Sequence, residues 1–225
     1  MQRASGFFDR EQHKRIEAAV ADAEAKTSCE IVPIVATTSG RYDRPEDIIG
    51  LWLAIFAAIT VWLLFPRLSN ESGDWDGMPI YVGLLTMVGG VVVAFILGVL
   101  AGSRIGWLRR LFTPSNQMRE EVSARARELF FDIRVHHTSG ATGLLIYVSL
   151  FEHMAVVLGD QKVLEKLGQT SLDRLCQLLT EGLRQGDSTN AICSVIAEAG
   201  KQLSGPLPRA EGDVNELQDT LVLID

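Results

Sequence analysis

The stretch TGLLIYVSLFEHMAVVLGD, residues 142–160, decides the fold of this chain. Its first part, residues 143–150, is apolar for about eight residues and contains Ile, Tyr and Val, which predicts a central strand buried on both faces. A lone strand of that length cannot satisfy its backbone in lipid, so the stretch belongs to a soluble core. A turn around residues 151–153 and the apolar run 154–158 then predict a β-hairpin.

A matching strand, CEIVPIVAT, is expected upstream at residues 29–37. Pro33 cannot donate a ladder hydrogen bond, so this strand is expected to be bulged there or to have an open side. Between the two strands, residues 114–133 keep their apolar side chains on one helical face. Strand, helix and strand in this order predict a right-handed parallel crossover. Ahead of it, Asp9 and Gln12 predict a helix that begins with a capping box.

The chain downstream of residue 160 is mostly helical in its pattern. Helices are expected over 160–168, where Asp160 is placed as N-cap, over 171–186 and over 187–203, because each keeps leucine, isoleucine or valine on one face. The final residues, TLVLID at 220–225, are interpreted as either a last strand or a docking segment. The expected fold class is therefore α/β, a small mixed sheet flanked by helices.

Two longer apolar runs separate the first strand from the helix that follows it. The first, IIGLWLAIFAAITVWLLF at 48–65, has about 18 residues, which span about 27 Å, close to the thickness of a bilayer core. The second, PIYVGLLTMVGGVVVAFILGVLA at 79–101, has about 23 residues, enough to cross with some tilt. We therefore predict a two-helix transmembrane hairpin over 48–102. Two buried core helices are the less favoured alternative, because core helices are usually shorter and carry some polar positions.

The hairpin interrupts one soluble α/β domain, whose parts are expected at residues 1–47 and 103–225. Arg104, Arg109 and Arg110 follow the second apolar run with no acidic residue among them, whereas the connecting loop contains only Arg67. The positive-inside rule then places both termini in the cytoplasm. The expected location is the plasma (inner) membrane, crossed twice.

Small residues recur at every fourth position in both apolar runs. Such stripes let helix backbones approach closely. Packing of the hairpin against itself is the favoured interpretation, and a seam for a second copy or for another membrane protein is the alternative. The stripes consist of Gly50, Ala54 and Ala58 in the first run and of Gly90, Ala94, Gly98 and Gly102 in the second.

The composition of the 225 residues excludes some classes of partner. The net charge is −7 and no basic stripe with interleaved aromatic residues occurs, so we expect no nucleic acid partner. The three cysteines, Cys29, Cys176 and Cys193, lie far apart and without metal-binding spacing, which indicates buried thiols in a reducing compartment. Expected partners are the lipid bilayer, membrane proteins and, for a homo-oligomer, a second copy of the chain.

Three segments of the soluble part resemble the TPM domain family: residues 7–39 (FFDREQHKRIEAAVADAEAKTSCEIVPIVATTS), 125–160 (RARELFFDIRVHHTSGATGLLIYVSLFEHMAVVLGD) and 186–200 (GDSTNAICSVIAEAG). The resemblance implies an α/β sandwich, often membrane-tethered. It also implies a role in assembly or repair of membrane complexes, calcium binding or acid phosphatase activity, depending on the member. This chain departs from the family layout, because its spans lie inside the domain. Its hairpin turn also reads FEH where family members with a metal site carry neighbouring aspartates, which weighs against calcium and phosphatase activity.

Reactive motifs are scarce in this sequence. No nucleophile elbow, phosphate loop or HExxH zinc motif occurs. Glu152 and Asp160 flank the apolar run 154–158, so they are the candidate cation site, with calcium as the ion; a turn acid plus a helix cap is the alternative. No other cofactor is expected.

The function expected from these observations is that of a membrane-tethered, TPM-like module that binds membrane proteins or assists their assembly and maintenance. With no reactive constellation visible, the interpretation leans towards a protein that is not an enzyme. Two alternatives stay open. One is a metal-assisted, acid-phosphatase-like hydrolase, and the other is a self-associating membrane scaffold.

Overall fold

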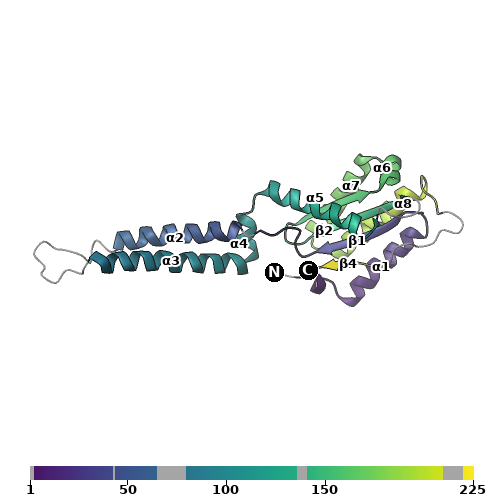
Figure 1. Cartoon of the computed structure of the whole chain (residues 1–225). Coiled ribbons are helices and arrows are strands. Elements are labelled where there is room, and N and C mark those ends of the chain that lie inside the picture. Colours follow the sequence, from purple (N-terminus) through teal and green to yellow (C-terminus); the bar gives the residue numbers. More distant parts are fainter. Residues whose placement is uncertain (1–2, 43, 65–79, 136–140, 210–219) are drawn as a thin grey trace, which may run out of the picture. The chain divides into compact units, whose positions relative to one another are not determined.

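The structure is a computed structural model that describes residues 3–42, 44–64, 80–135, 141–209 and 220–225 (Figure 1). Contacts between residues divide the chain into two compact units. One comprises Arg41–Pro114, and the other comprises Gln2–Gly40 together with Ser115–Asp225. The second is an α/β unit that the first interrupts in sequence. Arg67, on which the predicted orientation partly depends, lies outside the described residues.

The α/β unit is built on a four-stranded mixed sheet with the order β3-β2-β1-β4. Strand β1 (Glu30–Ala36) pairs in parallel with β2 (Gly143–Ser149), which pairs antiparallel with β3 (Met154–Gly159). Strand β4 (Val222–Ile224) pairs in parallel with the end of β1. The predicted parallel pairing of the two strands and the predicted β-hairpin at residues 143–158 are thereby confirmed. Of the two interpretations of the last residues, the structure shows the strand.

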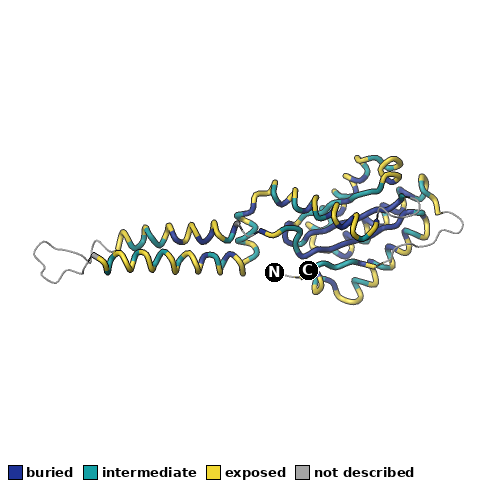
Figure 2. The backbone as a smooth tube through the Cα atoms, in the orientation of Figure 1, coloured by how far each residue is buried: buried dark blue, intermediate teal, exposed yellow. Residues whose placement is uncertain are grey.

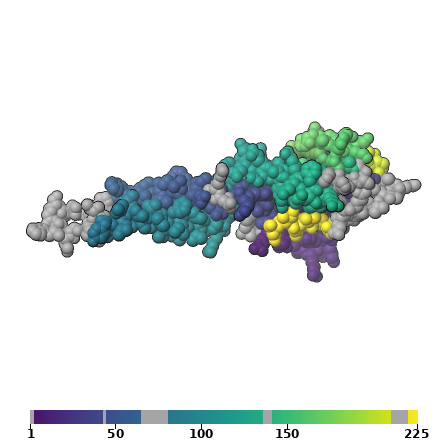
Figure 3. Space-filling view, viewed as in Figure 1, coloured from purple at the N-terminus to yellow at the C-terminus, as the bar shows by residue number. Residues whose placement is uncertain are grey.

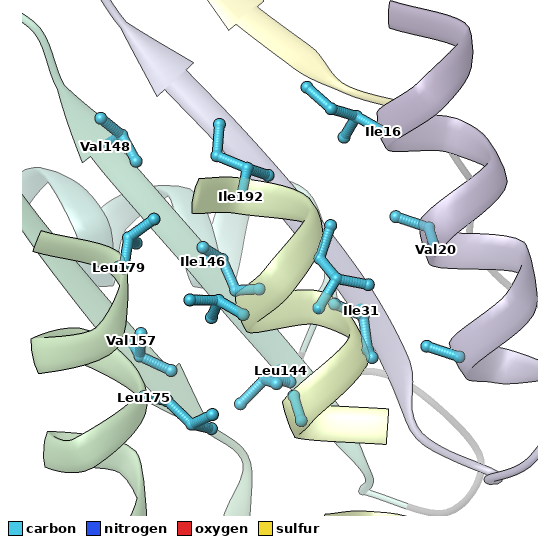
Figure 4. Packing of buried hydrophobic residues seen from close by; sticks show 14 of the residues in the cluster. Ile16, Val20, Ile31, Leu144, Ile146, Val148, Val157, Leu175, Leu179 and Ile192 are labelled. Atoms are coloured by element: carbon cyan, nitrogen blue, oxygen red, sulfur yellow. The ribbon is translucent and has the colours of Figure 1, made fainter. Parts of the chain in front are cut away.

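Helices cover both faces of this sheet, which explains why β1 and β2 are buried at every position (Figure 2). One face packs against α1 (Arg10–Glu24), α7 (Gln169–Arg184) and α8 (Ser188–Ser204), while α6 (Gln161–Leu167) contributes a buried valine. The other face packs against α5 (Ser115–Asp132). Figure 4 shows the first of these two cores, which includes Ile16, Val20, Ile31, Leu144, Ile146, Val148, Val157, Leu175, Leu179 and Ile192.

Pro33 lies in β1 without a bulge, because the register with β2 is continuous. The N–H groups of a strand alternate between its two neighbours. Thr37 donates to the carbonyl of Ile224 on the β4 side at 2.8 Å, so Pro33 and Ile31 also direct their backbone nitrogens to that side. Among the described residues, β4 pairs there only with the last three residues of β1, and the N–H of Ile31 donates instead to Glu24 Oε1 at 2.8 Å. The predicted open side is thus the reason that a proline is tolerated.

Helix α1 begins with the capping box that the sequence predicts. The Asp9 carboxylate accepts from the backbone N–H of Glu11 at 2.9 Å and of Gln12 at 2.7 Å, and Gln12 Oε1 accepts from the N–H of Asp9 at 2.8 Å. These bonds satisfy donors that have no partner within the helix.

Replacing Asp9 with alanine is expected to lower the free energy of unfolding of the α/β unit by about 1 kcal/mol, because the helix loses its cap. Urea unfolding of the detergent-solubilised chain, followed by circular dichroism, measures the change. Asp22→Ala, on the exposed side of the same helix, is the matched control and should change stability by less than about 0.5 kcal/mol. Equal losses for the two variants would contradict the capping role.

In the part of the inserted unit that the structure describes, the helices are α2 (Arg44–Leu64), α3 (Ile80–Arg104) and the short α4 (Gly106–Leu111). Helices α2 and α3 lie side by side and run in opposite directions (Figures 1 and 3). Both are long and apolar enough to cross a membrane, with a mean hydropathy of 2.2 over Pro45–Leu64 and 2.6 over Tyr81–Arg104. Only 17% and 6% of these windows are buried, whereas the core helices of soluble proteins are mostly buried.

Candidate functional site

Glu152 occupies the turn between β2 and β3, at the carboxyl end of β2, and none of its surface is exposed. Its carboxylate accepts from the backbone N–H of Ser39 at 2.8 Å and from the hydroxyl of Thr38 at 3.3 Å. The hydroxyl of Ser149 also donates to it. Glu152 therefore joins the residues that follow β1 to the turn that follows β2.

Tyr147 extends this polar cluster from within β2. Its hydroxyl lies 2.8 Å from Ser39 Oγ, and its side chain is fully buried. Burial raises the pKa of the Tyr147 phenol above its ordinary value, and the neighbouring Glu152 carboxylate adds to the shift. The phenol is therefore neutral at physiological pH and contributes a hydrogen bond. Ser39 is thus held through both its backbone and its side chain.

Asp160 lies at the other end of β3. It is the N-cap of α6, where its carboxylate accepts from the N–H of Gln161 at 2.7 Å, and its own N–H donates to the carbonyl of Gly143 at 2.8 Å. The second carboxylate oxygen is buried and has no hydrogen-bond partner among the described residues. Of the two roles that the sequence allows for Asp160, cation ligand or helix cap, the structure therefore shows the helix cap.

The structure does not bring the two candidate cation ligands together. Ser149 pairs with Met154 beside Glu152, whereas Leu144 pairs with Gly159 beside Asp160. Six residues of β3 separate these ends by about 20 Å, while calcium ligands lie about 2.4 Å from the ion. Among the described residues, no group of three or more histidine, cysteine, aspartate or glutamate side chains could hold a metal ion.

Cys29 is buried near acidic side chains, one of which is more than a hundred positions away in the sequence. Burial raises the pKa of its thiol far above the ordinary range, and the carboxylates of Glu24, Glu30 and Asp160 raise it further. The thiol therefore stays protonated and unreactive. Cys176 and Cys193 are half-buried and free, and burial raises the pKa of each of these thiols as well. All three thiols are therefore mainly protonated at physiological pH.

The small-residue stripes lie in the contact between α2 and α3. A Cβ atom added to Gly98 would lie 2.6 Å from the Cα of Gly50, and one added to Gly102 would lie 3.1 Å from the Cα of Glu46. Ala54 is also buried, and Ala58, Gly90 and Ala94 are half-buried. At the other end of the pair, a Cβ on Gly90 would meet only Val61, at 3.6 Å. This geometry favours packing within the pair, and the backbones approach most closely where α2 begins and α3 ends.

The outward sides of α2 and α3 carry large apolar side chains that the described residues leave uncovered. Two-thirds of the surface of Phe56, Trp62 and Leu85 is exposed, at 68%, 68% and 67%. Contiguous apolar patches larger than a few hundred Å² are rare on soluble monomers. These side chains therefore require an apolar environment. The same surface includes Leu51, Trp52, Ile55, Ile59, Leu63, Leu84, Val88, Val92, Val93, Ile96, Leu97 and Leu100.

Comparison with known proteins finds a solved structure with a similar fold but does not assign the chain to a family. No family model matches the chain, and no curated protein matches it. Among solved structures, the chain is similar to the NMR structure of the BA42 protein from the psychrophilic bacterium Bizionia argentinensis, with a TM-score of 0.55 and 18% identity. The match covers 96% of this chain and 94% of the other. At this identity, the two proteins share an α/β fold, and the likeness assigns no activity.

Proposed function

We propose that the chain is a membrane-anchored, TPM-like module whose α2–α3 pair crosses the plasma (inner) membrane, with the α/β unit on the cytoplasmic face. The observation that supports this proposal is the apolar exterior of the two helices. Leaving one large apolar side chain in water rather than burying it costs about 1.5 to 3 kcal/mol, and many such side chains lie on this surface. A bilayer removes that cost for all of them together.

The orientation rests on the arginines at the end of the pair. Arg104 closes α3, and Arg109 and Arg110 lie in α4, so three positive charges follow the second helix. Positive charge beside a membrane-crossing helix favours the cytoplasmic side. The end of α3 and the start of α2 lie together, so both connections to the α/β unit leave from the cytoplasmic surface.

The role of the module follows from how it is joined to the membrane. The chain leaves the α/β unit after β1 and returns to it at α5, so two connections hold that unit near the bilayer. Two connections restrict rotation more than one tether does, and the unit can then present one face to its neighbours. The residues best suited to chemistry, Glu152 and Asp160, are engaged in structural hydrogen bonds. The proposed activity is therefore binding of membrane proteins, in support of their assembly or maintenance.

Placing arginine in the middle of each helix is the test of the anchoring proposal. Phe56→Arg with Val93→Arg is expected to move the chain out of the alkaline-carbonate pellet, because each charge at the bilayer centre costs about 3 kcal/mol. Leu164→Arg, an exposed apolar position on α6, is the matched control and should stay in the pellet. In sealed spheroplasts, terminal epitopes of the unaltered chain should resist protease until the membrane is opened.

Wild-type protein in the carbonate supernatant would overturn the anchoring, and digestion of the epitopes in sealed spheroplasts would overturn the orientation. Cross-linking the same membranes before extraction in mild detergent tests the binding role. A membrane protein should then co-purify with the chain. Recovery of the chain alone would refute that role and leave the anchoring intact.

A further inference from the structure

Helix α4 is separated from α3 by one extended residue. Helix α3 ends at Arg104, Ile105 has φ −100° and ψ 92°, and the next helix begins at Gly106. The sequence alone reads as one continuous apolar and basic run at this point. The break therefore separates the two helices shortly after Leu100, the last large apolar side chain of α3.

Arg109 determines which side of α4 faces the rest of the inserted unit. Its Nε donates to the backbone carbonyl of Tyr42 at 2.8 Å and lies 3.5 Å from Glu46 Oε1, at the start of α2. Successive residues of an α-helix are rotated by about 100°, so Trp107 and Leu111 lie on nearly one face and point away from Arg109. These two side chains are 72% and 70% exposed.

The surroundings of this face indicate what covers it. Tryptophan side chains favour the boundary between lipid and water. The face lies next to the end of α3, whose own apolar side chains are exposed up to Leu100. Arg104 is exposed beside the break, Arg110 follows on α4, and residues 103–114 contain no acidic residue. An apolar strip flanked by positive charge fits the headgroup layer of an anionic bilayer.

We propose that α4 is an interfacial helix that lies on the cytoplasmic surface of the bilayer, with Trp107 and Leu111 inserted among anionic lipids and Arg104 at their headgroups. This inference rests on the membrane anchoring proposed above and adds a lipid class to it. Arg109 is its positioning residue, because it joins α4 to the start of α2 and directs the apolar face outward.

The test uses the full chain with Trp107 as its only tryptophan, made by Trp52→Phe, Trp62→Phe and Trp75→Phe. The protein is reconstituted into vesicles of phosphatidylcholine alone or mixed in equal parts with phosphatidylglycerol. In the anionic vesicles, Trp107 fluorescence should be shifted to the blue, quenched by lipids brominated near the headgroup and shielded from iodide. Phosphatidylcholine alone should give weaker shielding, because Arg104 loses its anionic partners.

Arg104→Gln in this background is expected to reduce the ratio of inserted to free Trp107 by about fivefold in anionic vesicles, the equivalent of about 1 kcal/mol per arginine. Arg119→Gln, an exposed arginine of α5, removes the same charge and should leave the ratio unchanged. In phosphatidylcholine alone the two variants should behave alike.

Three results would overturn the inference. In the first, iodide quenches Trp107 freely in anionic vesicles although carbonate does not extract the protein. This result refutes the interfacial helix and leaves the anchoring intact. Shielding that depends on the ratio of protein to lipid would show that a second copy covers the face. Protein that carbonate releases from the vesicles would instead refute the anchoring on which the inference rests.

Discussion

Gly98→Leu is expected to destabilise the α2–α3 pair by about 3 kcal/mol, the upper part of the usual range for overpacking. A Cβ atom at this position would lie 2.6 Å from the Cα of Gly50 and 3.1 Å from the carbonyl oxygen of Ile49. Both neighbours are backbone atoms of α2, so no rotamer change relieves the clash and the helices must separate. Thermal unfolding in mild detergent, followed by size-exclusion chromatography after heating, measures the loss.

Gly89→Leu is the matched control on the same helix. A Cβ atom there meets nothing within 4 Å, and the position is exposed, so the added side chain should leave the unfolding temperature almost unchanged. The experiment also tests the scaffold alternative. If the small residues formed a seam between copies, Gly98→Leu would reduce the particle mass and leave the stability of each monomer unaltered. A monomeric wild type destabilised by Gly98→Leu alone would support packing within the pair.

The fold could be predicted from local signals because its central elements carry them. The strand at 143–149 is mainly apolar, as suits a strand that is buried at every position between two layers of helices, and turn residues mark both of its ends. The capping box of Asp9 and Gln12 lies within three residues and needs no tertiary information. The sequence does not decide whether its last residues form a strand, since three residues are too few for a pattern and their pairing depends on the edge of β1.

The candidate site could not be predicted in the same way, because its contacts are not local. Glu152 and Asp160 lie eight positions apart, which makes a shared ion conceivable until the intervening residues are read as one straight strand. Two of the partners of Glu152, Thr38 and Ser39, lie more than a hundred positions earlier in the sequence. The break at Ile105 has only a weak local signal, the nearby glycines Gly102 and Gly106, which disfavour a helix without fixing where it ends.

Glu152→Ala is expected to lower the free energy of unfolding of the α/β unit by about 3 kcal/mol or more. The change removes the acceptor of the Ser39 N–H and of the buried Ser149 hydroxyl, whereas the Thr38 hydroxyl can still donate to the carbonyl of Gly40 at 3.1 Å. Each buried donor left unsatisfied costs about 1 to 3 kcal/mol. Urea unfolding of the detergent-solubilised chain measures the loss. Trypsin cleavage after Arg41, at the end of the segment that Glu152 holds, should become faster if the opening is local.

The choice of controls separates a structural carboxylate from a cation ligand. Glu165→Ala on α6 removes an exposed carboxylate bonded only to the Gln161 side chain among the contacts described, and should change stability by less than about 0.5 kcal/mol. Glu152→Gln keeps one oxygen that can accept from Ser39 and should recover part of the loss. A structural carboxylate predicts that calcium leaves the unfolding midpoint of the wild type unchanged. A midpoint that rises with calcium in the wild type and not in Glu152→Gln would instead make Glu152 a metal ligand, with partners other than the distant Asp160.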